Sequence, residues 1–254
     1  MTFSTEGGQI PPTLLTSDEE ARILSFIPTA NNPDPLYDVG YHESKIQHTL
    51  AFAPGFTRAE AWSIAMYLGP SKFYQGMNLA LAGSEDLCVE EREQFLLISL
   101  GARSALNKLP SVTTEQLSTL PHPPGSSYTD EPLVRYVTVQ EQVIERYEPE
   151  MVITEPRFTS TTYWQIPIGQ MQQYAQSANL VFRINYLPNG SQGKYVDPIK
   201  RVAREGEVLF PPDMTFIVRR KLVIDYPISS DARLRRMNVI EMDEYNENPN
   251  QRAV

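Results

Sequence analysis

The chain has 254 residues, enough for one large domain with a short addition, and 41% hydrophobic and 21% charged residues are typical of an ordinary globular protein. Acidic residues outnumber basic ones by 31 to 22, and the formal net charge of −9 argues against nonspecific binding to nucleic acid. No apolar run is long enough to cross a bilayer, the N-terminus lacks a signal-peptide pattern, and the single cysteine excludes an internal disulfide. With one cysteine and three scattered histidines, we expect no metal site.

Residues 1–55 are rich in proline, and we expect them to be largely irregular. One short helix is predicted at 17–26, with Ser17 as its N-cap and Glu20 three residues later. The segment is interpreted as an ordinary N-terminal extension. A delivery signal, a partner-binding segment and a lid over the domain are the open alternatives.

A helical region follows residue 56. Thr57 and Glu60 form a capping-box pattern, and Cys88, near the third helix, is expected to be a small core residue. The predicted helices are residues 57–69, 71–82 and 90–108.

After Pro132 the pattern changes to short apolar or hydroxyl-rich runs that indicate β-strands. The predicted strands are residues 133–139, 151–155, 157–163, 178–187, 207–210, 214–225 and 234–242, with helices near 141–147 and 167–176. Helices followed by strands predict an α+β domain. The glycine-rich motifs of dinucleotide-binding and P-loop folds are absent from the sequence.

Four polar residues lie in these strands or directly before one of them. An apolar strand carries Arg135, a hydroxyl-rich strand carries Ser160, and Glu205 and Glu207 stand one residue apart before an apolar run. Because alternate side chains of a strand share a face, we expect the two carboxylates to point into one site. Paired carboxylates can divide the roles that glycosidic-bond chemistry requires.

An arginine strand, then Phe-x-Ser-Thr-Thr, then Glu-x-Glu resembles the Arg-Ser-Glu class of mono-ADP-ribosyltransferases, of the arginine-specific bacterial toxin or effector type. The resemblance covers roughly residues 50–245. It implies an ADP-ribosyltransferase-like fold, with N-terminal helices packed on a split, mixed or antiparallel β core. The implied domains are an extension at 1–55, a catalytic domain at 56–245 and a polar tail at 246–254.

The resemblance also implies the chemistry. NAD⁺ would be the co-substrate without a metal, and Glu207 would stabilise the cation that forms on its ribose. Glu205 would orient an acceptor arginine, and Arg135 would hold a phosphate or the adjacent ribose. Ser160 would contact the ribose or position Glu207.

Neighbouring residues have less definite roles. Thr161 would brace the sheet, while Tyr163 and Trp164 would either stack beside NAD⁺ or belong to the core. The sequence departs from the family pattern at Tyr136, where glycine is frequent, and at Thr162, where serine is frequent.

The turn at about residues 198–204 would recognise the acceptor. It is basic and lacks the aromatic residue often found there in the family. The other basic residues of the C-terminal part are interpreted as solvent-facing strand positions; they are Arg219, Arg220, Lys221, Arg233, Arg235 and Arg236.

The expected partners are NAD⁺ and a target protein, and a chaperone or an immunity protein is left open. We do not expect the protein to bind a membrane or nucleic acid. We expect injection into a target cell by a dedicated bacterial system, or otherwise a cytoplasmic location. An NAD⁺ glycohydrolase and an inactive relative that binds partners are the alternatives.

Overall fold

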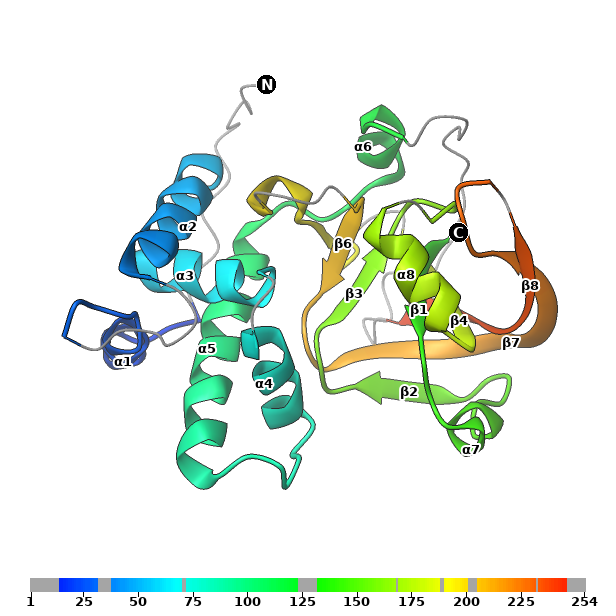
Figure 1. Ribbon diagram of the computed structural model, residues 1–254, viewed down its shortest axis with the longest axis horizontal. Helices are drawn as coiled ribbons and strands as arrows, with labels where there is room; N and C mark the ends of the chain where they lie inside the picture. The colour runs from blue at the N-terminus through cyan, green and yellow to red at the C-terminus, as the bar shows by residue number, and fades with distance from the viewer. Residues whose placement is uncertain are drawn as a thin grey trace. The chain divides into compact units, whose positions relative to one another are not determined.

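The computed structural model describes residues 14–31, 38–69, 72–122, 132–167, 169–187, 190–200, 205–231 and 233–245 (Figure 1). The chain divides into two compact units. The helical unit is Met1–Pro110 with Pro198–Arg201, and the sheet unit is Ser111–Asp197 with Val202–Val254. Residues 1–13 and 32–37 of the expected N-terminal extension, and the expected tail 246–254, lie outside the described residues.

The helical unit contains five described helices: α1 (Ser17–Ser25), α2 (Val39–Phe52), α3 (Arg58–Tyr67), α4 (Lys72–Leu81) and α5 (Val89–Lys108). Helix α5 packs against α1, α3 and α4, and α3 also contacts α2 (Figure 1). Trp62, Ile64 and Met66 of α3 are fully buried. Burial of such large apolar side chains is the main favourable term that holds the helices together.

Two expectations for helix starts need correction. The capping box of α1 is formed by Thr16 and Glu19, one residue before the predicted pair. Cys88 is exposed and is the N-cap of α5, where its Sγ accepts from the Glu91 backbone N–H, so it is not a core residue. The predicted box of Thr57 and Glu60 is confirmed.

Helix α2 lies in the segment that we expected to be irregular. Asp38 caps it by accepting the Tyr41 N–H at 2.6 Å. Its buried positions include His42, Lys45 and Thr49 beside Ile46, so they have helical spacing but mixed polarity. The apolar periodicity that reveals a helix in a sequence is therefore weak here.

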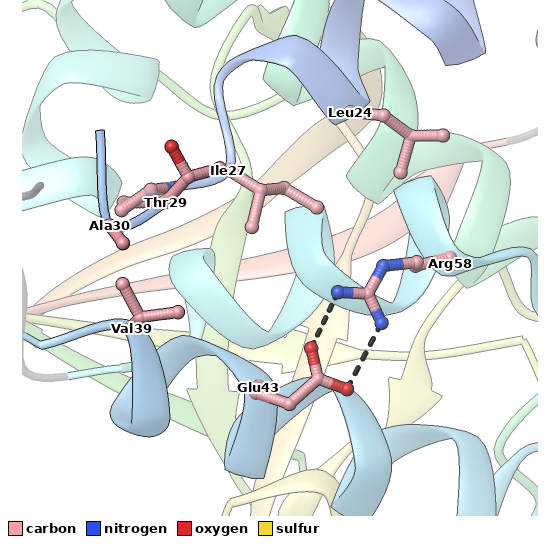
Figure 2. A pocket seen from close by; sticks show the side chains of 8 residues that line it. Leu24, Ile27, Thr29, Ala30, Val39, Glu43 and Arg58 are labelled. Carbon is pink, nitrogen blue, oxygen red and sulfur yellow. Dashed lines mark hydrogen bonds and ion pairs between the residues drawn. The ribbon is translucent and has the colours of Figure 1, made fainter. Parts of the chain in front are cut away.

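A cavity of about 320 Å³ lies in the helical unit (Figure 2). Its lining is mainly apolar, with the ion pair of Glu43 and Arg58 at its side. None of the residues that the sequence singles out for chemistry lines this cavity.

The sheet unit contains the described elements α6 (Thr114–Thr119), β1 (Leu133–Val137), α7 (Glu141–Glu145), β2 (Val152–Glu155), β3 (Thr159–Thr162), α8 (Gln170–Ser177), β4 (Leu180–Asn185), β5 (Lys194–Tyr195), β6 (Glu207–Phe210), β7 (Met214–Pro227) and β8 (Leu234–Tyr245). A short 3₁₀ turn, Asp197–Ile199, precedes β6. Helix α6 and strand β5 were not predicted.

The strands form one eight-stranded sheet in the order β2-β7-β8-β4-β1-β3-β6-β5. Pairing is antiparallel except between β4 and β8, which run parallel. The two described strands β1 and β3 meet through one residue pair, Val134 with Thr162. The predicted α+β class is confirmed, with a mixed, largely antiparallel sheet.

Several basic residues of β7 and β8 contact acids or carbonyl groups. Arg219 Nε is 2.7 Å from Asp243, and Arg220 Nε is 2.5 Å from Glu241. Arg235 donates to backbone carbonyls. These contacts support the interpretation of this cluster as ordinary strand positions.

No described helix is long and apolar enough to cross a membrane.

Glu60 provides a test of the helical unit. Its fully buried carboxylate accepts from Ser104 Oγ at 2.6 Å and from Lys108 Nζ at 2.7 Å. Burial acts to raise the pKa of Glu60, but the hydrogen bonds from Lys108, Ser104 and the Thr57 backbone lower it overall. Glu60→Gln should lower the free energy of unfolding by about 3 kcal/mol at neutral pH, because it leaves Lys108 without its charged partner.

The pH dependence follows from the lowered pKa. The ionised carboxylate stabilises the fold above its unfolded pKa, and this contribution is lost as the pH falls through the folded pKa. Denaturant titrations should therefore show wild type and Glu60→Gln converging in acid. The matched control is Glu43→Gln, whose pair with Arg58 is largely exposed and should contribute about 1 kcal/mol or less. Equal losses in the two variants would contradict the prediction.

Candidate active site

The centre of the candidate site is the pairing of β3 with β6. The register places Thr162 opposite Glu207 and Ser160 opposite Leu209, so Ser160 and Glu207 are diagonal neighbours on one face. Ser160 Oγ donates a hydrogen bond to Glu207 Oε1. Glu207 is only 4% exposed, so its carboxylate is held by a hydroxyl group in a largely desolvated position.

The other two hydroxyl groups of β3 bind backbone. Thr161 Oγ1 donates to the Val208 carbonyl at 2.7 Å and ties β3 to β6. Thr162 Oγ1 donates to the Glu205 carbonyl at 2.6 Å and accepts the Trp164 N–H at 3.0 Å. Thr162 therefore fixes the backbone on both sides of the site.

The segment from Glu205 to Glu207 is a turn that leads into β6. The strand begins at Glu207, as predicted, while Gly206 has φ +63°. This left-handed conformation breaks strand alternation, so the argument that both carboxylates share a strand face does not apply to Glu205. Glu205 is half-buried, and its backbone, rather than a strand register, determines its position.

Asp197 supports this turn and was not identified from the sequence. Its carboxylate accepts the backbone N–H groups of Glu205 at 3.1 Å, Gly206 at 2.8 Å and Glu207 at 3.0 Å. Burial raises the pKa of Asp197, and the hydrogen bonds from these three N–H groups oppose the rise. Nothing in its local sequence, a Val-Asp-Pro segment directly before the predicted turn at 198–204, indicates this contact.

Tyr163 and Trp164 lie in the core of the sheet unit and are 6% and 7% exposed. Tyr163 Oη donates to the Pro121 carbonyl at 2.7 Å, and its ring contacts those of His122 and Tyr195. The Trp164 indole covers Gly206, whose Cβ, if present, would be 2.8 Å from Trp164 Nε1. This Nε1 is buried and has no acceptor among the described residues.

Arg135 lies on β1, next to β3, but one residue out of step with the site. The register pairs its neighbour Val134 with Thr162, whereas Arg135 is opposite Phe182 of β4. Burial raises the pKa of Tyr147, and the positive charge of Arg135 is among the charges that oppose this rise. The structure thus brings Ser160, Thr162, Glu205 and Glu207 together. Arg135 lies on the adjacent strand, at a position that alternates to the opposite face from Val134 and Thr162.

The remaining expectations concern the turn at 198–204 and metals. Lys200 is described, whereas Arg201 and Arg204 lie outside the described residues. Across the described part of the chain, no three His, Cys, Asp or Glu side chains form a group that could hold a metal ion.

The comparisons with known proteins identify the family and the fold. The model of a family described as ADP-ribosyltransferase exoenzyme matches residues 117–243, which include β1, β3 and β6. No curated protein sequence matches the chain.

Several solved structures share the fold. The Vis toxin, an ADP-ribosyltransferase from Vibrio splendidus, aligns with 83% of this chain and 85% of its own at 17% identity and a TM-score of 0.53. The type III effector XopAI from Xanthomonas axonopodis pv. citri aligns with 91% of this chain and 84% of its own at 15% identity and a TM-score of 0.60. For the enzymatic component C2-I of the Clostridium botulinum C2 toxin, the figures are 82% and 47%, at 16% identity and a TM-score of 0.52.

Gly206 is the most sterically restricted position of the turn, and Gly206→Ala tests it. A left-handed non-glycine residue costs about 1–2 kcal/mol, and the new Cβ would also displace the Trp164 indole. The control is Gly169→Ala, which has φ +54° but no atom within 4 Å of its Cβ. We expect denaturant titration to show a larger loss for Gly206→Ala, and a red-shifted Trp164 emission in that variant alone. Identical behaviour of the two variants would contradict the packing described here.

Proposed function

Since this chain belongs to the ADP-ribosyltransferase exoenzyme family, whose donor substrate is NAD⁺, we propose that it transfers ADP-ribose to an arginine side chain of a target protein. The observation that carries this proposal is the buried carboxylate of Glu207, held by the Ser160 hydroxyl on paired strands. Neither residue type is unusual, but a carboxylate fixed in a buried position by a neutral donor is placed to act on charge that develops on a substrate.

The reaction breaks the bond between the nicotinamide nitrogen and C1′ of the ribose. The bonding electrons leave with nicotinamide, which departs neutral, and positive charge develops on the ribose. The Glu207 carboxylate stabilises this cation more strongly than it stabilises NAD⁺ itself, which is the requirement for catalysis. A guanidinium nitrogen of the acceptor then forms the new bond to C1′ and loses one proton.

The arginine acceptor is proposed from Glu205. A guanidinium group is a cation at all relevant pH values, so a carboxylate beside the reacting carbon can both attract and orient it. Glu205 precedes Glu207 by two residues, and its backbone is fixed by Thr162 and Asp197. The Vis toxin has been solved in complex with agmatine, a small molecule that carries a guanidinium group, which supports the same acceptor chemistry here.

Other residues would bind the donor. The buried Trp164 Nε1, which lies against Gly206, offers a hydrogen-bond donor. Thr161 would brace β3 against β6. Arg135 is proposed as the phosphate or ribose ligand on the family resemblance alone, because its register does not align it with Glu207.

We also propose residues 56–245 as the catalytic domain and delivery of the protein into a target cell. Exoenzyme membership and the naming of Vis as a toxin and XopAI as a type III effector support this proposal. The partners would be NAD⁺ and the protein that carries the acceptor arginine.

Glu207→Gln tests the central role. The amide oxygen can still accept from Ser160, so the variant removes the charge while it keeps the shape. We expect nicotinamide release and ADP-ribose transfer to fall together, on the order of 10²- to 10³-fold. The measurement is release of labelled nicotinamide, with the thermal unfolding midpoint as the check on folding. Activity near that of wild type would mean that another group stabilises the cation.

Glu205→Gln tests the acceptor assignment. We expect transfer to agmatine and to proteins of a cell lysate to be lost, while NAD⁺ hydrolysis is largely spared. Labelled bands made by the wild type should disappear with hydroxylamine, which cleaves the arginine linkage. Equal loss of transfer and hydrolysis would mean that Glu205 serves the NAD⁺ chemistry instead. Hydroxylamine-resistant bands would rule out arginine as the acceptor.

A further inference from the structure

One carboxylate binds every backbone N–H of the Glu205–Gly206–Glu207 turn. Asp197 Oδ1 accepts from Glu207 N at 3.0 Å, and Oδ2 accepts from Gly206 N at 2.8 Å and from Glu205 N at 3.1 Å. Asp197 is 5% exposed, so these are charge-assisted hydrogen bonds in a largely water-free position.

The carbonyl groups of the same turn have different partners. The Glu205 carbonyl accepts from Thr162 Oγ1, the Gly206 carbonyl from Tyr163 N at 3.1 Å, and the Glu207 carbonyl from Val196 N at 3.1 Å. Three different residues therefore hold the carbonyl groups of the turn, whereas all three N–H groups depend on the side chain of Asp197. Removing that side chain would leave three N–H groups without their acceptor and a left-handed Gly206 without its main restraint.

We propose that Asp197 is a positioning residue that clasps this turn and holds Glu205 and Glu207 in the geometry that the reaction requires. The inference rests on the proposed function, since it assigns a role toward the same two carboxylates. In the sequence, Asp197 and Glu205 flank the predicted acceptor turn at residues 198–204. No contact of Asp197 with the substrates is implied.

The expected kinetic effect follows from where the clasp acts. NAD⁺ binding draws on many groups, whereas stabilisation of the ribose cation depends on the position of Glu207. A misplacement of the order of 1 Å can lower a rate by up to about 10²-fold. A loosened turn should therefore reduce kcat and leave KM for NAD⁺ little changed.

Asp197→Asn is the test variant. The amide has one acceptor oxygen, and its NH₂ group would face a backbone N–H that now has no acceptor. We expect kcat for nicotinamide release to fall on the order of 10- to 100-fold. Hydrogen exchange, followed by mass spectrometry on peptides that contain residues 205–207, should become faster.

Glu244→Gln is the matched control. Glu244 is also buried and holds a loop of the sheet unit, because it accepts from Leu187 N at 3.0 Å, Ser191 Oγ at 2.8 Å and Gln192 N at 2.6 Å. Its loop contains none of the proposed site residues. This variant should lose comparable stability and keep kcat near that of wild type, with faster exchange confined to its own loop.

Three results would overturn the proposal. They are an unchanged kcat in Asp197→Asn, unchanged exchange at residues 205–207 in that variant, and an equal loss of kcat in Glu244→Gln. A wild type that releases no nicotinamide would overturn the proposed function and the kinetic role with it. The exchange data would still decide separately whether the clasp exists.

Discussion

The antiparallel pairing of β3 with β6 is the constraint on which the candidate site depends. Val208 and Phe210 of β6 are fully buried, and they alternate with Glu207 along the strand. A slip of one residue would move Glu207 to the face that Val208 and Phe210 now occupy and would place its carboxylate in the apolar core. The hydrophobic core therefore fixes the register, and the register brings Ser160 to Glu207. The burial of Val208 and Phe210 therefore supplies the free energy that positions Ser160 beside Glu207.

The parts of the fold that depend on local patterns could be predicted from the sequence. The capping box at Thr57 and the strands beginning at Leu133 and Glu207 follow from short-range rules, because a cap or an apolar run is written within a few residues. The association of Ser160 with Glu207 was left open between two roles, since hydroxyl groups of a strand have several partners within reach. The family resemblance, not the pattern, supplied the choice of these residues.

What the sequence could not reveal depends on contacts between distant or atypical residues. Asp197 reads as part of an unremarkable loop, and its role arises only when the chain returns to bring three N–H groups to it. In the sequence, a glycine between two glutamates is compatible with a strand. Its left-handed conformation becomes evident only when the contacts with Trp164 and Asp197 are known. Helix α2 was missed because polar His42 and Lys45 are on its buried face, and Cys88 was misjudged because cysteine seldom serves as a helix cap.

The single residue pair between β1 and β3 has a mechanical consequence. Within these described strands, Val134 with Thr162 is the one rung that joins the block β2-β7-β8-β4-β1 to the block β3-β6-β5. Backbone hydrogen bonds give little resistance at this seam, and cohesion there comes mainly from apolar side chains that both blocks contribute to one core, such as Leu133 and Val208. Strain applied to the sheet would therefore concentrate where β1 meets β3, beside Thr162. Small displacements of the two blocks relative to each other would break few backbone hydrogen bonds. Ser160 of β3 and Glu207 of β6 both belong to the smaller block and would move together. Their hydrogen bond would therefore persist during such a displacement.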